Sequence, residues 1–216
     1  LGKVIYEKRL TSREAFSTFL CQLPPGIPVL METGPGAQSW ARLLLKQGNQ
    51  PRILPAQHVV THRSGPKNDR NDVLAILRAG RDEKIHAVPV KTVAGLEMQA
   101  LHRVRRRYVR EHTAMGNQMR GLLLEHGFSI PQGKAAIDRN VTRLLEDSGE
   151  PIPGMLHELI AELLAEWKQM AERIEVMTGR LERAVRGDED AKRLMTIRGV
   201  GPILSSAVIA KQTEPE

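Results

Sequence analysis

Residues 28–54 read PVLMETGPGAQSWARLLLKQGNQPRIL, and this stretch decides the fold of the first part of the chain. The apolar run Pro28–Glu32 predicts a short buried strand that ends in an acid. The turn residues Gly34–Gly36 separate it from a predicted helix over about residues 38–46, and residues 52–54 begin a second strand. Strand, helix and strand in this order indicate an α/β unit around a largely parallel sheet.

The flanking sequence extends this α/β pattern to roughly residues 1–90. Residues 2–10 predict a short strand, and residues 69–78 predict a helix. The last predicted strand covers residues 85–90, and Pro89 places it at an edge because proline has no N–H to donate to a neighbouring strand. We therefore expect one α/β layer in the first part of the chain.

The composition favours a globular protein with a polyanionic partner. Of the 216 residues, 41% are hydrophobic, which is enough to build a core. The formal net charge of +7 favours DNA or RNA as a partner, although an ordinary basic surface would give the same number. Aromatic residues make up only 3%, so we expect contact with the nucleic-acid backbone rather than base stacking.

The chain has one cysteine, Cys21, so it cannot form an internal disulfide or a cysteine-based zinc cluster. This fits a reducing cytosol. No apolar run approaches the ~20 residues that span a bilayer, and the N-terminal residues show no signal pattern. We therefore expect a cytoplasmic protein without a membrane partner.

From Thr92 the sequence predicts long helices rather than alternating elements. A polar helix-forming stretch continues to about His126, and residues 156–181 carry an a/d heptad pattern. The apolar residues of that pattern are Leu156, Ile160, Leu163, Trp167, Met170, Ile174, Met177 and Leu181. A helix of this length extends about 40 Å and needs a partner, either the helix over residues 92–126 or a second subunit. We therefore predict a helical, coiled-coil region over residues 91–187 and a homo-oligomer that forms through the heptad helix.

Three acids in the α/β part form the candidate metal site. Glu32 ends a strand, where open α/β sheets commonly bind ligands. Asp69 and Asp72 begin a helix three residues apart and so share one face of it. Hard cations such as Mg2+ prefer oxygen ligands, and two ions held by shared carboxylates can assist phosphodiester cleavage. The alternative for each Asp is an ordinary role as a cap or a dipole partner in the first helical turn.

A stripe of arginines on the predicted helix over residues 92–126 is the candidate nucleic-acid surface. Its members follow i, i+3, i+4, i+7 spacing and are Arg103, Arg106, Arg107 and Arg110. An arginine can contact a phosphate through two donors at once, so this face could follow a nucleic-acid backbone. The alternative is a solvated face that pairs with acids of the heptad helix such as Glu158 and Glu162.

Residues 196–204 have the small-residue turn of a helix-hairpin-helix, with Gly199 and Gly201 at its centre. In that motif, backbone N–H groups at a helix N-terminus meet phosphate oxygens. The alternative is that the glycines only permit a tight turn between two helices.

A series of short motifs runs through the chain in order. They are Val29–Glu32 with Trp40–Arg42, Lys67–Asp69 with Asp72, Val88–Lys91, Leu101–Arg103, and Thr196–Pro202. Together they resemble the DEDD transposases of the IS110 group of insertion sequences, and the resemblance spans almost the whole chain. The sequence departs from that family's usual pattern at residues 34–39, which affects the loop geometry more than the metal site.

The resemblance implies an RNase H-like (RuvC-like) domain over residues 1–90, whose four acids bind Mg2+ or Mn2+. Glu32, Asp69 and Asp72 match the last three of those acids. The family's first acid would precede this sequence and its nucleophilic serine would follow it. We therefore expect a fragment without the first strand and without most of the C-terminal serine domain, with residues 188–216 as the start of that domain.

The resemblance also implies an activity and partners. It predicts a transposase or recombinase that performs Mg-dependent DNA strand cleavage and exchange, with the element ends and the target as DNA partners. A guide (bridge) RNA and several subunits are implied as well. We expect the chain as it stands to fold and bind rather than to cut DNA. Two alternatives stay open, a non-catalytic nucleic-acid-binding module that uses the basic helices and the hairpin turn, and a helical interaction protein that uses the heptads alone.

Overall fold

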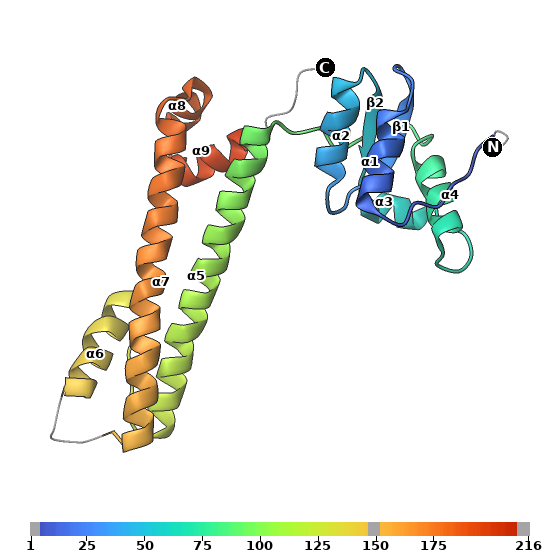
Figure 1. Ribbon diagram of the computed structural model, residues 1–216. Coiled ribbons are helices and arrows are strands. Elements are labelled where there is room, and N and C mark those ends of the chain that lie inside the picture. The colour runs from blue at the N-terminus through green and yellow to red at the C-terminus, as the bar shows by residue number, and fades with distance from the viewer. Residues whose placement is uncertain (1–4, 147–151, 211–216) are drawn as a thin grey trace. The chain divides into compact units, whose positions relative to one another are not determined.

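The computed structural model describes residues 5–146 and 152–210, which form two compact units. The first, which we call the α/β unit, ends at Thr92, and the second, the helical unit, begins at Val93. The α/β unit contains α1 (Arg13–Cys21), β1 (Pro28–Glu32), α2 (Ala37–Lys46), β2 (Gln50–Leu54), α3 (Ala56–Thr61) and α4 (Asp69–Ala79). The helical unit contains α5 (Val93–Glu125), α6 (Lys134–Glu146), α7 (Gly154–Arg186), α8 (Glu189–Met195) and α9 (Pro202–Ile209) (Figure 1).

β1 and β2 pair in parallel at the centre of the α/β unit (Figure 1). Their register runs from Pro28 opposite Gln50 to Glu32 opposite Leu54. Because α2 connects the two strands, the predicted strand–helix–strand order over residues 28–54 is confirmed.

Alternating side chains of the strands cover the two faces of this sheet. On one face, Ile53 belongs to a buried cluster with Ala41 of α2. On the other face, Leu54 belongs to a cluster with Val59 of α3 and Ala75 of α4. Helices therefore cover both faces of the sheet, and a small buried core lies on each face.

The strand predicted over residues 2–10 is wrong for the part that the structure describes. Residues 5–10 have no regular structure and are mostly exposed, and the earlier residues lie outside the described part. A strand needs a paired neighbour to satisfy its backbone groups, and β1 pairs instead with β2.

The strand predicted over residues 85–90 is reduced to an isolated antiparallel bridge between Val88 and Ile53. Pro89 cannot donate a hydrogen bond to a ladder. Side chains of α2 form hydrogen bonds with the backbone of this segment instead. Gln38 donates to the carbonyl oxygen of Pro89 at 3.2 Å. The segment lies at the edge of the sheet, as the proline predicts, without extending the ladder.

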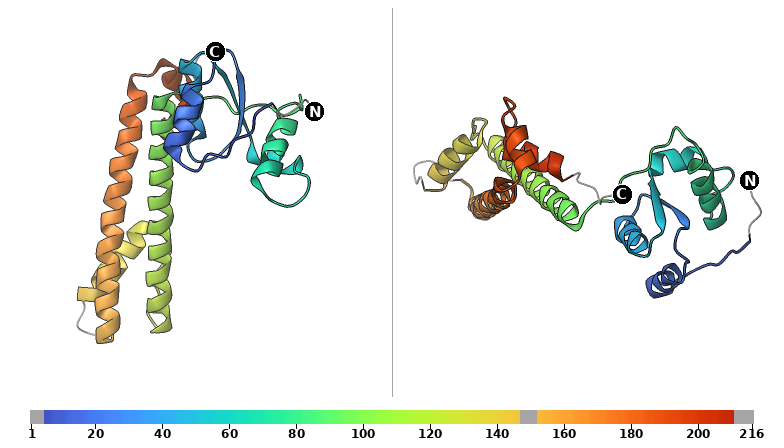
Figure 2. Two further views of the ribbon diagram at one scale, coloured as in Figure 1. Left: turned by 45° about the vertical axis from the view of Figure 1, so that its right-hand side comes forward. Right: turned by 90° about the horizontal axis from the view of Figure 1, so that it is seen from above.

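α5 and α7 lie side by side and run antiparallel along the helical unit (Figures 1 and 2). Arg105 of α5 donates to Thr178 of α7 at 2.8 Å. Further along α5, His112 stacks on Trp167 of α7 with ring centroids 4.3 Å apart. The helix predicted over residues 92–126 is therefore confirmed as α5, and it is a partner of the heptad helix α7.

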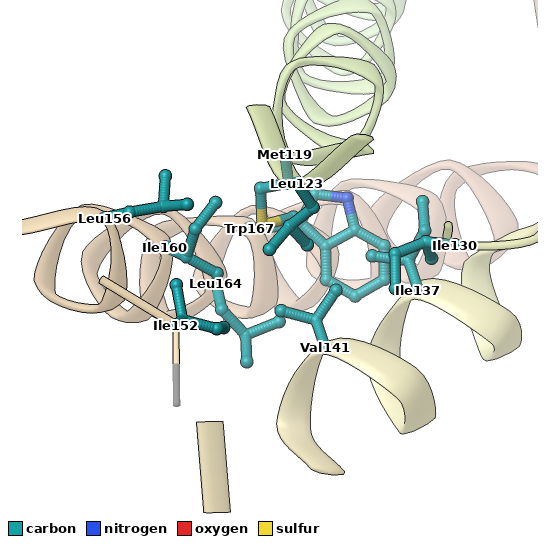
Figure 3. Close-up of a cluster of buried hydrophobic side chains, with 10 residues drawn as sticks. All are labelled: Met119, Leu123, Ile130, Ile137, Val141, Ile152, Leu156, Ile160, Leu164 and Trp167. Atoms are coloured by element: carbon teal, nitrogen blue, oxygen red, sulfur yellow. The ribbon is translucent and has the colours of Figure 1, made fainter. Parts of the chain in front are cut away.

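Buried apolar side chains gather where α6 packs against α5 and α7 (Figure 3). The cluster consists of Met119, Leu123, Ile130, Ile137, Val141, Ile152, Leu156, Ile160, Leu164 and Trp167. The indole of Trp167 lies among side chains from both neighbouring helices (Figure 3). This end of the helix pair therefore holds the main core of the helical unit.

The predicted heptad positions of α7 are buried only in part. Leu156, Ile160, Trp167, Ile174 and Leu181 are buried, and Leu163, Met170 and Met177 are half-buried. Leu164, which lies outside the pattern, is buried because α6 also packs against this part of α7. Packing against two helices widens the apolar face beyond a strict a/d seam, so the coiled coil stays a prediction.

Candidate carboxylate site and nucleic-acid surface

Glu32 is the last residue of β1, and it is half-buried. Leu30, two residues earlier, packs so closely against Gly80 after α4 that a Cβ atom there would collide with it. Because alternate residues of a strand share a face, Glu32 points to the side of the sheet that α4 covers. Its register partner Leu54 belongs to the buried cluster on that side.

α4 brings Asp72 to the same side of the sheet. The helix begins after Asn68, whose side chain accepts a backbone N–H of the first turn at 2.8 Å. Ala75 packs in one cluster with Leu54, and Asp72 lies one turn earlier on the same helical face. Glu32 is thus the register partner of Leu54, and Asp72 lies one turn before Ala75, the residue of α4 in the same cluster as Leu54.

Both aspartates have an arginine partner. Arg9 lies 3.3 Å from Asp69, and both side chains are largely exposed. Arg63 Nη1 lies 3.4 Å from Asp72 Oδ1, and these side chains are only 30% and 36% exposed. In residues 5–146 and 152–210, no three His, Cys, Asp or Glu side chains lie close enough together to hold a metal ion. Two of the predicted ligands thus share a side of the sheet, but the three are not gathered around one point.

The donor set nevertheless fits a hard divalent cation. Glu32, Asp69 and Asp72 offer only carboxylate oxygens, which are the ligands that Mg2+ and Mn2+ prefer. In the structure, positive charge beside the two aspartates comes from arginine side chains. The roles of the three acids as metal ligands and as catalytic residues therefore stay predictions.

The arginine stripe lies on the outer side of α5, where Arg103, Arg106, Arg107 and Arg110 are all exposed. Arg107 donates to Glu111 at 2.7 Å, and this hydrogen bond raises the pKa of Arg107. The spacing thus gives one continuous cationic side of the helix, as the sequence predicts.

The alternative pairing of this stripe with Glu158 and Glu162 does not occur among the ion pairs of the described residues. α5 and α7 are antiparallel, and the contact of Arg105 with Thr178 sets their register. Glu162 lies 16 residues from Thr178, which is about 24 Å along α7. The basic turns of α5 therefore lie beside the C-terminal half of α7, which carries exposed Arg180 and Arg183.

The turn around Gly199 and Gly201 connects α8 to α9. Gly199 has φ +89°, a left-handed conformation that favours glycine. Gly201 is the N-cap residue of α9 and makes no side-chain capping bond, and Pro202 begins the helix. Gly201 is exposed, Pro202 has no backbone N–H, and the N–H groups of Leu204 and Ser205 donate to the carbonyl oxygen of Gly201. The helix-hairpin-helix role of both glycines stays a prediction.

α9 is fixed to α5 by polar contacts that sequence reasoning missed. The two serines of α9, Ser205 and Ser206, are fully buried. Ser206 Oγ lies 3.0 Å from His102 Nε2, and Gln99 donates to the carbonyl oxygen of Ala210 at 2.8 Å. Burial lowers the pKa of His102, and neighbouring Arg105 adds to this effect. The Leu101–Arg103 motif contained a signal for His102, but its partner is 104 residues away.

The comparisons with known proteins show the family to which the chain belongs. A family model for IS110-type DEDD transposases, described as "Transposase", matches residues 3–128. The chain belongs to this transposase family. The matched region includes β1, α4 and the whole of α5, which carry the predicted carboxylates and the arginine stripe.

Curated relatives extend the similarity to nearly the whole chain. A probable family 20 transposase of Pseudomonas aeruginosa is 36% identical over 94% of this chain and 60% of its own length. The transposase of insertion sequence element IS1328 of Yersinia enterocolitica is 36% identical over 97% of the chain and 61% of its own length. That of IS1111A of Coxiella burnetii is 31% identical over 97% of the chain. The chain thus spans about three fifths of the relatives that it matches.

No solved structure matches the chain significantly. Within the described residues, no helix is long and apolar enough to cross a membrane.

Proposed function

We propose that the chain is the part of an insertion-sequence transposase that positions catalytic carboxylates and contacts nucleic acid. The observation that carries this proposal is the placement of Glu32 and Asp72 on one side of the sheet, in a chain of the transposase family. Glu32 lies at the carboxyl end of β1, where α/β proteins bind their ligands, and Asp72 lies in the first turn of α4. The α/β unit is accordingly proposed to have an RNase H-like fold.

In the proposed reaction, Glu32, Asp69 and Asp72 would hold Mg2+ or Mn2+. A bound cation of this kind supplies activation of a water or hydroxyl and stabilises the leaving oxygen of a phosphodiester. The protein contributes the position of the carboxylates: the end of β1 fixes Glu32, and the packing of Ala75 against Leu54 fixes the helical face that carries Asp72. The activity is DNA strand cleavage and exchange.

The proposed nucleic-acid partners are the DNA ends of the element, the target DNA and a guide RNA. The exposed stripe of Arg103, Arg106, Arg107 and Arg110 supports backbone contact, and the start of α9 at Gly201 supports a further phosphate contact. Self-association through α7 is proposed as well, because Leu159 and Val176 are exposed large apolar residues on this helix.

DNA recombination by the intact protein tests the enzymatic proposal. We expect Glu32→Ala or Asp72→Ala to abolish recombination, because each removes a carboxylate that the reaction requires. Glu162→Ala, a change of an exposed acid on α7, is the matched control and should leave the rate unchanged. A normal rate in both carboxylate variants would contradict the proposal.

A second candidate is a non-catalytic nucleic-acid-binding module. It is favoured by the pairing of Asp69 with Arg9 and of Asp72 with Arg63, because acids paired in this way can serve a structural role alone. This candidate predicts nucleic-acid binding by the arginine stripe and no metal uptake that depends on the carboxylates. Metal titration therefore separates the two functions.

A further inference from the structure

Arg63 is a cationic side chain close to the candidate carboxylate site that the sequence motifs do not assign. It follows α3 in the loop that leads to α4, and its Nη1 atom lies 3.4 Å from Asp72 Oδ1. The two side chains are 30% and 36% exposed, so solvent screens this pair less than an exposed one. Arg63 therefore acts on the same carboxylate that the proposed function requires for a metal ion.

The position of Arg63 is set by a structured loop. Arg78 of α4 donates to the carbonyl oxygen of His62 at 3.3 Å and to Ser64 Oγ at 2.8 Å, so both neighbours of Arg63 are anchored. Asn71 donates to the carbonyl oxygen of Pro66 at 2.8 Å. The helix that carries Asp72 thus also holds the loop that carries its partner.

We propose that Arg63 is the counter-cation of Asp72 in the metal-free site and that a divalent cation must displace it. This inference rests on the proposed function. The physical reason is competition, because a guanidinium and a divalent cation at one carboxylate repel each other. The positive charge of Arg63 thereby balances the negative charge of Asp72 before a metal ion binds, and it lowers the metal affinity of the site.

The ion pair of Arg9 with Asp69 provides a matched control. Its side chains are 82% and 78% exposed, so water and salt screen its effect on a bound cation. Removing the charge of Arg9 should therefore change metal affinity much less than removing the charge of Arg63.

Calorimetric titration of Mn2+ into the full chain tests the proposal. We expect Arg63→Gln to bind Mn2+ more tightly than the unmodified chain by roughly tenfold, on the order expected for the loss of one nearby positive charge. Arg63→Met, which keeps the aliphatic stem, should give the same result and serves if the Gln variant does not fold. Arg63→Lys, which keeps the charge, and Arg9→Gln should bind Mn2+ like the unmodified chain.

The outcomes separate this inference from the proposed function. If Asp72→Asn abolishes Mn2+ binding while the neutral Arg63 variants bind no more tightly than the unmodified chain, the inference is overturned and the metal site stands. Equal tightening by Arg63→Lys and Arg63→Gln would also overturn it, because charge would not be the cause. If Asp72→Asn binds Mn2+ like the unmodified chain, both the inference and the proposed metal site are wrong.

Discussion

The two compact units place their candidate functional residues differently with respect to their cores. In the α/β unit, Glu32 is the register partner of the buried Leu54, and Asp72 lies one turn before the buried Ala75. In the helical unit, the main buried cluster lies where α6 packs and includes Met119 and Leu123 of α5, whereas the arginine stripe lies earlier on α5, over residues 103–110. The core and the candidate site thus coincide in one unit and are separated along the helices in the other. Substitutions should therefore affect stability and binding together in the first unit and independently in the second.

The largest effect that tests this separation is expected for Trp167→Ala. Trp167 is 5% exposed and packs in the main cluster of the helical unit. Its removal should lower the free energy of unfolding of that unit by about 3–5 kcal/mol. The chain has two tryptophans, so Trp40 of the α/β unit remains as a fluorescent reporter in this variant. Circular dichroism should show an earlier helical transition, whereas an equal shift of the Trp40 transition would show that the units do not unfold separately.

A smaller effect is expected when the arginine stripe is neutralised. The triple variant Arg103→Gln, Arg106→Gln and Arg110→Gln removes exposed charges that are not part of the main cluster, so thermal stability should stay unchanged. In filter binding to duplex DNA, the slope of log affinity against log salt should become shallower by about 2.7 if each arginine contacts one phosphate.

The matched control for the stripe lies on or beside α6. Lys134, Arg139 and Arg143 are exposed, and their replacement by Gln removes the same charge next to the core cluster. The control should leave the salt slope unchanged. Equal loss of affinity in both triple variants would mean that net charge rather than the stripe governs binding.

Two glycines of α5 allow a finer test of where the helical core ends. A Cβ atom on Gly116 would lie 3.0 Å from Ile137 Cδ1 and 3.2 Å from Trp167 Nε1, whereas one on Gly121 would meet nothing within 4 Å. Gly116→Ala should therefore destabilise the unit by about 1 kcal/mol or more through overpacking. Gly121→Ala should stabilise it by up to about 1 kcal/mol through helix propensity. Chemical unfolding measures both, and stabilisation by Gly116→Ala would contradict the packing.

The smallest effect is a pH dependence of the helical unit. Burial lowers the pKa of His112 from its ordinary value of 6.5, and Lys134 adds to this. As the pH falls below 6.5, the unfolded chain binds a proton at His112 that the folded chain does not bind. The free energy of unfolding of the helical unit therefore decreases below this pH and keeps its full value above it. His112→Phe should retain the ring stacking on Trp167 and remove part of this loss. Melting temperatures between about pH 8 and 5.5 measure the effect, and an unchanged dependence in the variant would exclude His112 as its source.

Local signals in the sequence were sufficient to predict the centre of the α/β unit. The apolar run before Gly34 and the turn after α2 define β1, α2 and β2, because each boundary depends on residues next to it in the chain. The predicted helix over residues 92–126 is observed as Val93–Glu125. Strand pairing is not local, so the edge segment near Val88 was predicted as a strand although it forms an isolated bridge.

The acids of the candidate site are predictions from the sequence, whereas their neighbours come from the structure alone. Glu32 and Asp72 follow from their positions at the ends of elements, but the partner of Asp72 is a loop residue whose position depends on bonds from Arg78. The contact of His102 with Ser206 joins residues that are 104 positions apart. No periodicity in a single helix reports a contact of this kind.

The central claim is that the carboxylates of the α/β unit form the metal site of a transposase. Mn2+ uptake by the full chain, measured calorimetrically, tests it most directly. We predict that the double variant Glu32→Gln and Asp72→Asn loses Mn2+ uptake, whereas the triple arginine variant of α5 retains it. Equal Mn2+ uptake by the carboxylate variant and the unmodified chain would contradict the account and favour a binding module without catalysis.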